Sequence, residues 1–295
     1  MRWLQFKIQA NQNNVEVYSE CLTKAGAVAV TLQSGENQAV FEPLPGTTPF
    51  WKHTSVIGLF EENADIIAIK KFLKKHLGEE VVQDLQIATL AEQNWENAWI
   101  DQFQPMRFGN NLLICPSWCE SPDSNAVNIL LDPGLAFGTG THPTTRLCLE
   151  WLDAHPPQGA LVVDYGCGSG ILGIAALKLG AAQVYAVDYD PQALESTKVN
   201  AEKNGLSKKE IIPILPNALK LPKKADLLIA NILANPLKDL ACLFADLIRQ
   251  DGTIVLSGIL ENQMEEVFSH YKKWFKLLEI SNEEEWIRVS AIKFL

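Results

Sequence analysis

Residues 161–173 read L-V-V-D-Y-G-C-G-S-G-I-L-G, and this stretch decides the fold of the larger part of the chain. An apolar run ends at Asp164, and an alanine-rich helical pattern begins soon afterwards. Three glycines stand between them at alternate positions: Gly166, Gly168 and Gly170. This order predicts a strand, a tight turn and a helix. Glycine permits positive φ and close approach of a ligand, and the first amides of the helix are unpaired. The glycine turn (166–170) therefore predicts a site for a nucleotide-like ligand.

Two ligand classes fit the glycine turn. Gly168, Gly170 and Gly173 match the dinucleotide spacing G-x-G-x-x-G, and Asp188 lies about 20 residues further on, where an acid would bind a ribose. Read from Asp164, the same letters give D-x-G-x-G-x-G, which resembles the first motif of S-adenosylmethionine-dependent methyltransferases. A carboxylate there would repel a pyrophosphate but attract the cationic ammonium and sulfonium of S-adenosylmethionine. The charge argument favours the methyl donor over NAD, and a turn that only packs a helix on a sheet is a third interpretation.

The composition bounds the class of protein. A chain of 295 residues, 47% of them hydrophobic, is long enough for two domains with sizeable cores. Its formal net charge of −10 predicts repulsion of free nucleic acid and attraction of basic partners. Six cysteines form no C-x-x-C pair and only five histidines are present, so we expect reduced thiols and no metal site. There is no apolar run of about 18 residues and no leader pattern, so a soluble, cytoplasmic protein is expected.

Residues 1–90 are expected to form a small α+β domain. Apolar periodicity predicts, in chain order, a strand at 4–8, a helix at 15–25, strands at 27–33 and 54–60, a helix at 66–77 and a strand at 81–89. This is the βαββαβ order of ferredoxin-like domains. Small domains of this kind usually bind a partner, so we expect this one to recognise the substrate.

A connecting helix is predicted over residues 91–104. Trp95 and Trp99 lie one turn apart on the same face of this helix, and we expect both indoles to pack between the domains. Residues 105–295 then form the second domain, which is expected to bind the ligand and carry out the chemistry. A pair of strands is predicted at its beginning, over residues 107–117 and 125–131.

A second glycine-rich stretch begins at Asp132 and reads D-P-G-L-A-F-G-T-G-T-H-P-T-T-R. It lacks the G-K-[ST] ending of a phosphate loop, so binding of a nucleoside triphosphate is not expected. A flexible loop that ends at a helix N-terminus offers hydroxyls and amides to a small zwitterion, such as the methionine end of the donor. Phe137 in this loop is a candidate donor contact, and a solvated linker is the alternative interpretation.

Beyond the glycine turn, strands and helices alternate. Strands are predicted at 183–187, 211–215, 225–230 and 252–258, helices at 191–204, 237–250 and 262–270, and a final antiparallel hairpin at 276–280 and 285–294. A terminal hairpin on a mostly parallel sheet is typical of class I methyltransferases and not of nicotinamide domains. The sequence therefore predicts a Rossmann-like α/β methyltransferase domain with a seven-stranded sheet.

Ligands of open parallel sheets bind at the carboxyl ends of the strands. We expect Gly166 to lie against the donor, and Asp188 to accept hydrogen bonds from both ribose hydroxyls. Asp190 is available to cap the helix that Pro191 opens, which leaves Asp188 for the ligand. Asn231, at the end of a strand, can turn its carbonyl oxygen toward a reacting amine. Positioning and desolvation can supply most of the acceleration, so no general base or nucleophile is assigned.

Several motifs together resemble one known family. They are D-P-G-L-A-F-G-T-G-T-H-P-T-T, D-Y-G-C-G-S-G-I-L, A-V-D-Y-D-P, A-N-I-L-A-N-P-L, the W-x-x-x-W of the linker and the E-P-L-P-G of the first domain. Over the whole chain the sequence resembles bacterial ribosomal protein L11 methyltransferases. The resemblance implies donor binding through Thr145, Gly166, Asp188 and Asn231, and a first domain that recognises the ribosomal protein. It also implies methylation, up to trimethylation, of lysine side chains and of the N-terminal α-amine.

The expected partners follow from this resemblance and from the acidic charge. They are the cofactor S-adenosylmethionine and the substrate ribosomal protein L11, which is expected to bind in its free form before ribosome assembly. The protein itself is expected to be a monomer that contacts neither nucleic acid nor membrane. Further candidate donor-binding residues are Asp164, Gly168, Gly170 and Phe137, and Asn231 is expected to orient the amine. The alternatives are a class I methyltransferase for another protein, a nucleic acid or a small molecule and, more remotely, an NAD-dependent oxidoreductase.

Overall fold

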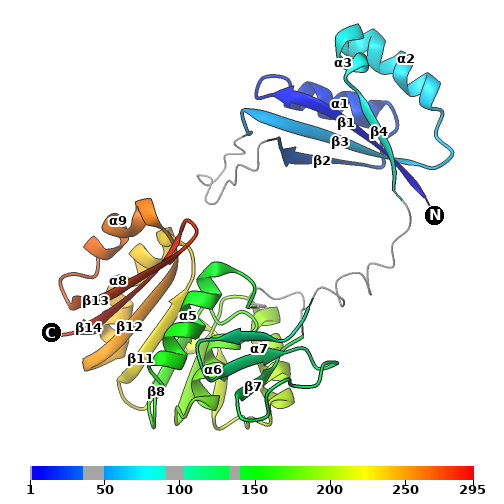
Figure 1. Ribbon diagram of the computed structural model, residues 1–295. Coiled ribbons are helices and arrows are strands. Elements are labelled where there is room, and N and C mark those ends of the chain that lie inside the picture. Colours follow the sequence, from blue (N-terminus) through cyan, green and yellow to red (C-terminus); the bar gives the residue numbers. More distant parts are fainter. Residues whose placement is uncertain (1, 36–49, 91–102, 133–139) are drawn as a thin grey trace. The chain divides into compact units, whose positions relative to one another are not determined.

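The computed structural model describes residues 2–35, 50–90, 103–132 and 140–295 (Figure 1). The chain divides into two compact units, Met1–Ile100 and Asp101–Leu295. The predicted helix over 91–104 lies, apart from its last two residues, outside the described residues, and so does Phe137. The predicted domain limits therefore stay predictions. No helix in the described part of the chain is long and apolar enough to cross a membrane.

The N-terminal unit has the predicted βαββαβ order with one short helix added. Its elements are β1 (Trp3–Asn11), α1 (Val15–Lys24), β2 (Ala29–Ser34), β3 (His53–Glu61), α2 (Ile66–Leu77), α3 (Glu79–Gln83) and β4 (Gln86–Leu90). The strands pair antiparallel in the order β2-β3-β1-β4. One apolar cluster joins the sheet to α1 and α2, which lie on the same side of it (Figure 1). This is the ferredoxin-like arrangement.

The predicted strand over 81–89 is wrong in its first half. Gly78 adopts a φ of 99° at the end of α2, and the chain turns there into α3. Glu79 and Glu80 occupy the first turn of α3, where the positive end of the helix dipole stabilises acidic side chains. Only Gln86–Leu90 remain extended, and they pair with β1.

The larger unit is built on a seven-stranded sheet. Its elements are α5 (Pro143–Ala154), β8 (Leu161–Tyr165), α6 (Ile171–Lys178), β9 (Gln183–Val187), α7 (Pro191–Lys203), β10 (Ile211–Ile214), β11 (Ala225–Asn231), α8 (Ala234–Leu247), β12 (Ile248–Leu260), α9 (Met264–Ser269), β13 (Phe275–Glu283) and β14 (Trp286–Lys293). The strand order is β10-β9-β8-β11-β12-β14-β13, and only β14 runs antiparallel to its neighbours on both sides. The predicted Rossmann-like fold with a C-terminal antiparallel hairpin is confirmed.

Two apolar clusters cover the two faces of this sheet. One joins it to α5, α6 and α7, and the other joins it to α8 and α9. The sheet is thus the middle of three layers, which explains why its central strands are apolar on both sides. Because helices occupy both faces, a ligand has access at the ends of the strands.

The boundary between α8 and β12 differs from the prediction of a helix over 237–250. The helix ends at Leu247, and the fully buried Ile248 already pairs with Ala225 of β11. No glycine or proline marks the passage from helix to strand in the sequence, so the prediction from periodicity placed the end of the helix too late. The strand also continues past Gly258, where a register shift against β14 keeps the pairing to Leu260.

A small sheet of three strands precedes α5, in the order β5 (Met106–Phe108), β6 (Leu112–Cys115) and β7 (Val127–Leu130). The single strand predicted over 107–117 is therefore wrong, because the chain turns at Gly109. A Cβ atom there would lie 2.3 Å from Oδ2 of Asp153. That buried carboxylate accepts hydrogen bonds from the backbone of the turn and holds it on α5.

Candidate functional site

The sheet topology brings together the ends of the three strands that carry or precede the predicted site residues. Strand β8 lies between β9 and β11 and is parallel to both. The glycine turn follows β8, Asp188 follows β9 and Asn231 ends β11. From β8 the chain proceeds to β9 and β10 on one side and then returns to β11 on the other side of β8. These residues therefore surround the point where the strand order reverses and ligands of open α/β sheets bind.

The glycine turn has the backbone geometry that its sequence predicts. Gly166, Gly168 and Gly170 have φ values of 80°, 53° and 81°, which residues with a Cβ atom rarely adopt. The amides of Gly166 and Cys167 donate to the carbonyl oxygen of Val187 at 2.7 and 3.0 Å. The turn is therefore fixed against the end of β9, and Gly170 begins α6.

Asp188 faces the glycine turn and is half-buried. Its Oδ2 accepts a hydrogen bond from the amide of Gly168 at 3.0 Å, and its Oδ1 accepts one from the amide of Asp190 at 3.0 Å. Asp190 caps α7 by accepting from the amide of Gln192, as expected. Each oxygen of Asp188 keeps further acceptor capacity, so the carboxylate can still receive two hydroxyl protons.

Asp164 lies beneath the turn and is only 1% exposed. Its Oδ2 accepts from the amide of Gly173 in the first turn of α6 at 2.8 Å, while its buried Oδ1 has no hydrogen-bond partner among the described residues. Burial raises the pKa of Asp164 to about 7, the bond from Gly173 opposes this rise and the charge of Asp188 adds to it. The carboxyl is therefore partly protonated near neutral pH, and a cation placed at Oδ1 would favour its charged form.

Asn231 is joined to the first turn of α5. Its side-chain nitrogen donates to Oγ1 of Thr145 at 3.2 Å, and Thr145 is 1% exposed. The neighbouring strand supports the same turn, because the hydroxyl of the buried Ser257 lies 3.2 Å from the carbonyl oxygen of Thr144. The bond to Thr145 occupies a donor of Asn231 and leaves its carbonyl oxygen as an acceptor for an amine.

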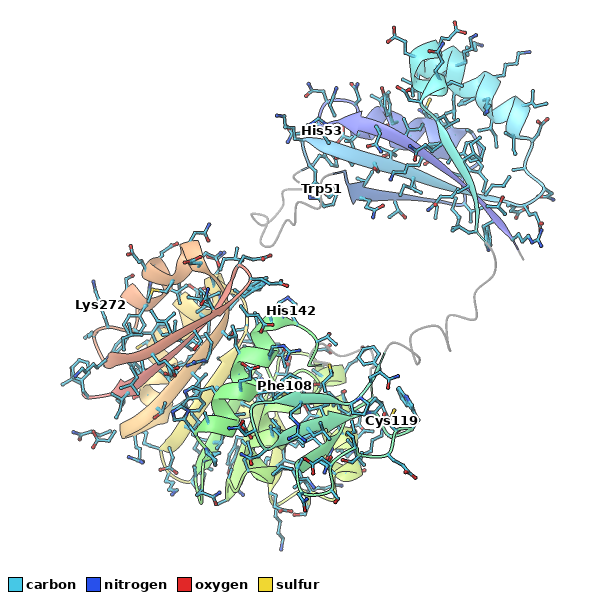
Figure 2. The ribbon with its side chains drawn as sticks, viewed as in Figure 1. Trp51, His53, Phe108, Cys119, His142 and Lys272 are labelled. Carbon is cyan, nitrogen blue, oxygen red and sulfur yellow. The ribbon has the colours of Figure 1, made fainter. Side chains whose placement is uncertain are left out.

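Sequence reasoning missed His142, which lies at the beginning of α5 (Figure 2). Its Nδ1 accepts from the amide of Thr144, and its ring packs edge-on against Trp286 with 5.1 Å between the ring centroids. Burial lowers the pKa of His142, and the charges of Glu284 and Glu285 oppose this shift. Trp286 pairs with the last residue of β12, so the acidic hairpin turn lies at the same edge of the sheet as the site. In the sequence, the H-P pair at 142–143 and the E-E-E run at 283–285 were the signals that could have indicated this histidine and its acidic neighbours.

Ile232, which follows Asn231, was missed as well. A Cβ atom on Gly166 would lie 2.2 Å from Cγ2 of Ile232. A residue with a Cβ atom at 166 would therefore have to displace Ile232 and adopt a positive φ, whether or not a ligand lies over the turn. No sequence signal links these two residues, because they follow different strands.

A family model and sequence relatives match this chain over almost its full length, and a solved structure matches part of it. The family described as "Ribosomal protein L11 methyltransferase (PrmA)" matches residues 2–293. A relative of the same description from Tolumonas auensis is 47% identical over 293 residues, which cover 99% of both chains. Another from Salmonella dublin is 48% identical over 295 residues, 99% of this chain and 100% of the relative. The crystal structure of a ribosomal protein L11 methylase from Lactobacillus delbrueckii subsp. bulgaricus matches with a TM-score of 0.59 and 30% identity, covering 65% of this chain and 100% of that chain.

Proposed function

The chain belongs to the ribosomal protein L11 methyltransferase family, and from this premise we propose that it transfers methyl groups from S-adenosylmethionine to amines of ribosomal protein L11. The observation that carries the proposal is similarity over both units, since relatives at 47–48% identity are covered almost from end to end. The acceptor amines are lysine side chains and the N-terminal α-amine, each receiving up to three methyl groups.

The donor half of the proposed site consists of the glycine turn, Asp164 and Asp188. The positive φ values of the turn leave its backbone open to a ligand, and Asp188 receives the ribose hydroxyls. The unpartnered Oδ1 of Asp164 fits the ammonium of the donor. When bound, S-adenosylmethionine supplies a methyl group on a cationic sulfonium. Phe137 stays a predicted donor contact outside the described residues.

The acceptor half consists of Asn231, Thr145 and Ser257, and the family resemblance implies that Asn231 and Thr145 contact the donor as well. A lysine has a pKa of about 10.4, so only about one molecule in a thousand is neutral near pH 7.4. The carbonyl oxygen of Asn231 can orient the NH₂ group without stabilising the ammonium as strongly as a carboxylate would. The bond from Asn231 to Thr145 fixes the amide for this task. Positioning and exclusion of water then favour transfer.

Recognition of the substrate is assigned to the N-terminal domain, residues 1–90, joined by a linker helix at 91–104 to the catalytic domain, residues 105–295. The formal net charge of −10 favours a basic ribosomal protein in its free form, before assembly hides it in the ribosome. The proposal includes a monomeric, cytoplasmic enzyme that binds neither nucleic acid nor membrane.

The direct experiment is incubation of the protein with S-adenosylmethionine and purified ribosomal protein L11, followed by intact-mass and peptide mass spectrometry. We expect methyl groups on lysines and on the α-amine of L11. Calorimetric titrations with S-adenosylmethionine and with NAD test the cofactor separately. Binding of the donor without methylation of L11 would favour another substrate, and binding of NAD alone would favour the oxidoreductase.

A further inference from the structure

The side chain of Ile232 lies directly over the glycine turn. Apart from the adjacent residues in the chain, the described atoms within 4 Å of an ideal Cβ on Gly166 are Cγ2 of Ile232 at 2.2 Å and Cβ of Ile232 at 3.7 Å. Ile232 is half-buried at the carboxyl edge of the sheet and packs against the cluster around α8. The methyl group of one branched aliphatic side chain therefore lies in the direction in which a Cβ atom of Gly166 would point.

The backbone of Ile232 is held on its other side by β12. Its amide donates to the carbonyl oxygen of Ser257 at 3.2 Å. A Cβ atom on Gly258 would lie 2.3 Å from the carbonyl oxygen of Ile232 and 2.7 Å from its carbonyl carbon. Gly258 has a φ of 82° and lies where the register of β12 shifts. One glycine in the turn after β8 and one glycine on β12 thus leave room for the same residue, which fixes its position.

This position connects the two halves of the site. The backbone of Ile232 continues from Asn231, which is anchored to Thr145, while its side chain reaches the turn at Gly166. An amine held by Asn231 and a methyl donor on the glycine turn must meet beside this side chain. Each transferred methyl group enlarges the amine, so a later transfer needs more room than the first.

We propose that Ile232 is a specificity-determining residue, a rigid apolar wall whose size sets the room for the acceptor amine and thereby the number of methyl groups that it can receive. The inference rests on the proposed methyl transfer and extends it to the degree of methylation. A residue that only supported the fold would slow every transfer alike. A side chain that limits the room for the amine changes the ratio between the rates of the later methyl transfers and the rate of the first.

The first test is a size series at position 232 with S-adenosylmethionine and recombinant L11, in which mass spectrometry measures mono-, di- and trimethylated amines over time. Ile232→Phe should slow the last transfer about tenfold more than the first, an effect within the range of steric discrimination by a pocket. Ile232→Ala should complete all transfers, and Ile232→Met, of similar volume, should resemble the wild type. Leu278→Ala, which shortens an exposed aliphatic side chain on β13, is the control for generic effects. An unchanged ratio between early and late transfers throughout the series overturns the proposal.

The second test needs no protein substrate and uses calorimetric titration with S-adenosylmethionine. Gly166→Ala should weaken donor affinity about tenfold because the new Cβ displaces Ile232, and Ile232→Ala in the same chain should restore most of it, a coupling typical of touching residues. The strain of positive φ at 166 is common to both variants and cancels. If the double variant binds no better than Gly166→Ala, the wall is absent. Failure of the wild type to methylate L11 while this rescue persists would instead contradict the proposed substrate.

Discussion

The donor half and the acceptor half of the site are assembled over very different distances along the chain. In the donor half, the bond from Gly173 to Asp164 joins residues 9 positions apart, and the bond from Gly168 to Asp188 spans 20 positions. Both are formed within one strand–turn–helix–strand segment. The donor half is therefore a local structure, fixed mainly by backbone geometry.

The acceptor half depends on tertiary packing. The bond from Asn231 to Thr145 spans 86 positions, and the bond from Ser257 to the backbone of Thr144 spans 113. Side chains of β11 and β12 have to meet the first turn of α5 before an amine can be oriented. The comparison teaches that donor binding and amine positioning can be disturbed separately, and the following variants test this separation.

The largest effect is expected for Asp188→Ala. The variant removes the carboxylate that accepts the hydrogen bond of the Gly168 amide and that is predicted to bind the ribose hydroxyls. Loss of two charge-assisted hydrogen bonds at about 1.5–3 kcal/mol each should weaken donor affinity by about a hundredfold or more. Calorimetric titration with S-adenosylmethionine measures this, and circular dichroism checks the fold.

Asp190→Ala is the matched control for Asp188→Ala. It removes the cap of α7 and should lower the free energy of unfolding by about 1 kcal/mol. Because Asp190 uses its side chain for the helix, donor affinity should remain that of the wild type. Equal donor affinities in Asp188→Ala and the wild type would refute the ribose assignment.

Asn231→Ala should affect turnover more than donor affinity. Without the amide, the acceptor amine loses its orienting oxygen, and kcat should fall by about ten- to a hundredfold, as for removal of a positioning hydrogen bond. Thr145→Val should lower kcat less, because Asn231 is kept but loses its anchor. Steady-state kinetics with L11, together with donor titrations, separate the two quantities.

The double variant of Asn231 and Thr145 sharpens this prediction. If Thr145 acts through Asn231, the effects on kcat should not add, since the anchor has no purpose once the amide is gone. Additive effects would show that Thr145 contacts the ligands independently. A loss of donor affinity as large as the loss of kcat would contradict the separation of the two halves.

The same difference in chain distance explains what the sequence could predict. The glycine turn, Asp164 and Asp188 belong to one local motif, so residue spacing identifies them together. Most helices and strands follow from periodicity for the same reason. The errors fall at α3, at the turn between β5 and β6, and at the passage from α8 to β12. At that passage, tertiary pairing of Ile248 with β11 overrides a helical pattern that no glycine or proline interrupts.

The acceptor half was less accessible. Asn231 became a candidate because it ends a predicted strand, whereas Thr145 became one through family resemblance, and no spacing rule joins residues so far apart. The contact of Ile232 with Gly166 and Gly258 depends on the order of the strands in the sheet, which the sequence does not state. His142 was missed because the proline that follows it is an ordinary first residue of a helix, so the pair was interpreted only as a helix start.

The pH dependence of Asp164 tests the donor half through protonation. Its pKa in the folded protein, about 7, lies above the value near 3.8 of an exposed aspartate. Between these two pKa values the folded state binds more protons than the unfolded state. The free energy of unfolding therefore falls as the pH rises, by up to about 1.4 kcal/mol per pH unit, and Asp164 contributes no further change above about pH 7. Asp164→Asn should remove this dependence, which thermal melts from pH 4 to 8 would measure.

Donor binding should show the opposite trend at Asp164. A cationic ligand at Oδ1 favours the carboxylate, so affinity for S-adenosylmethionine should rise from pH 6 to pH 8 by less than about tenfold per unit. Asp164→Asn should give a flat profile. A flat profile in the wild type would mean that the buried carboxyl supports only the turn.

The smallest effect is expected for Ser257→Ala, at the most distant link of the acceptor half. The variant removes the hydroxyl near the carbonyl oxygen of Thr144, at a cost of about 1 kcal/mol in stability. The first turn of α5 should shift slightly, which would lower kcat by about two- to fivefold through Thr145 and Asn231. Donor affinity should not change, because no bond of Ser257 reaches the glycine turn among the described residues. Kinetics with L11 and titration with S-adenosylmethionine give both values. Equal losses in kcat and donor affinity would mean that the two halves respond as one unit, and the contrast between local and long-range assembly would then have no functional meaning.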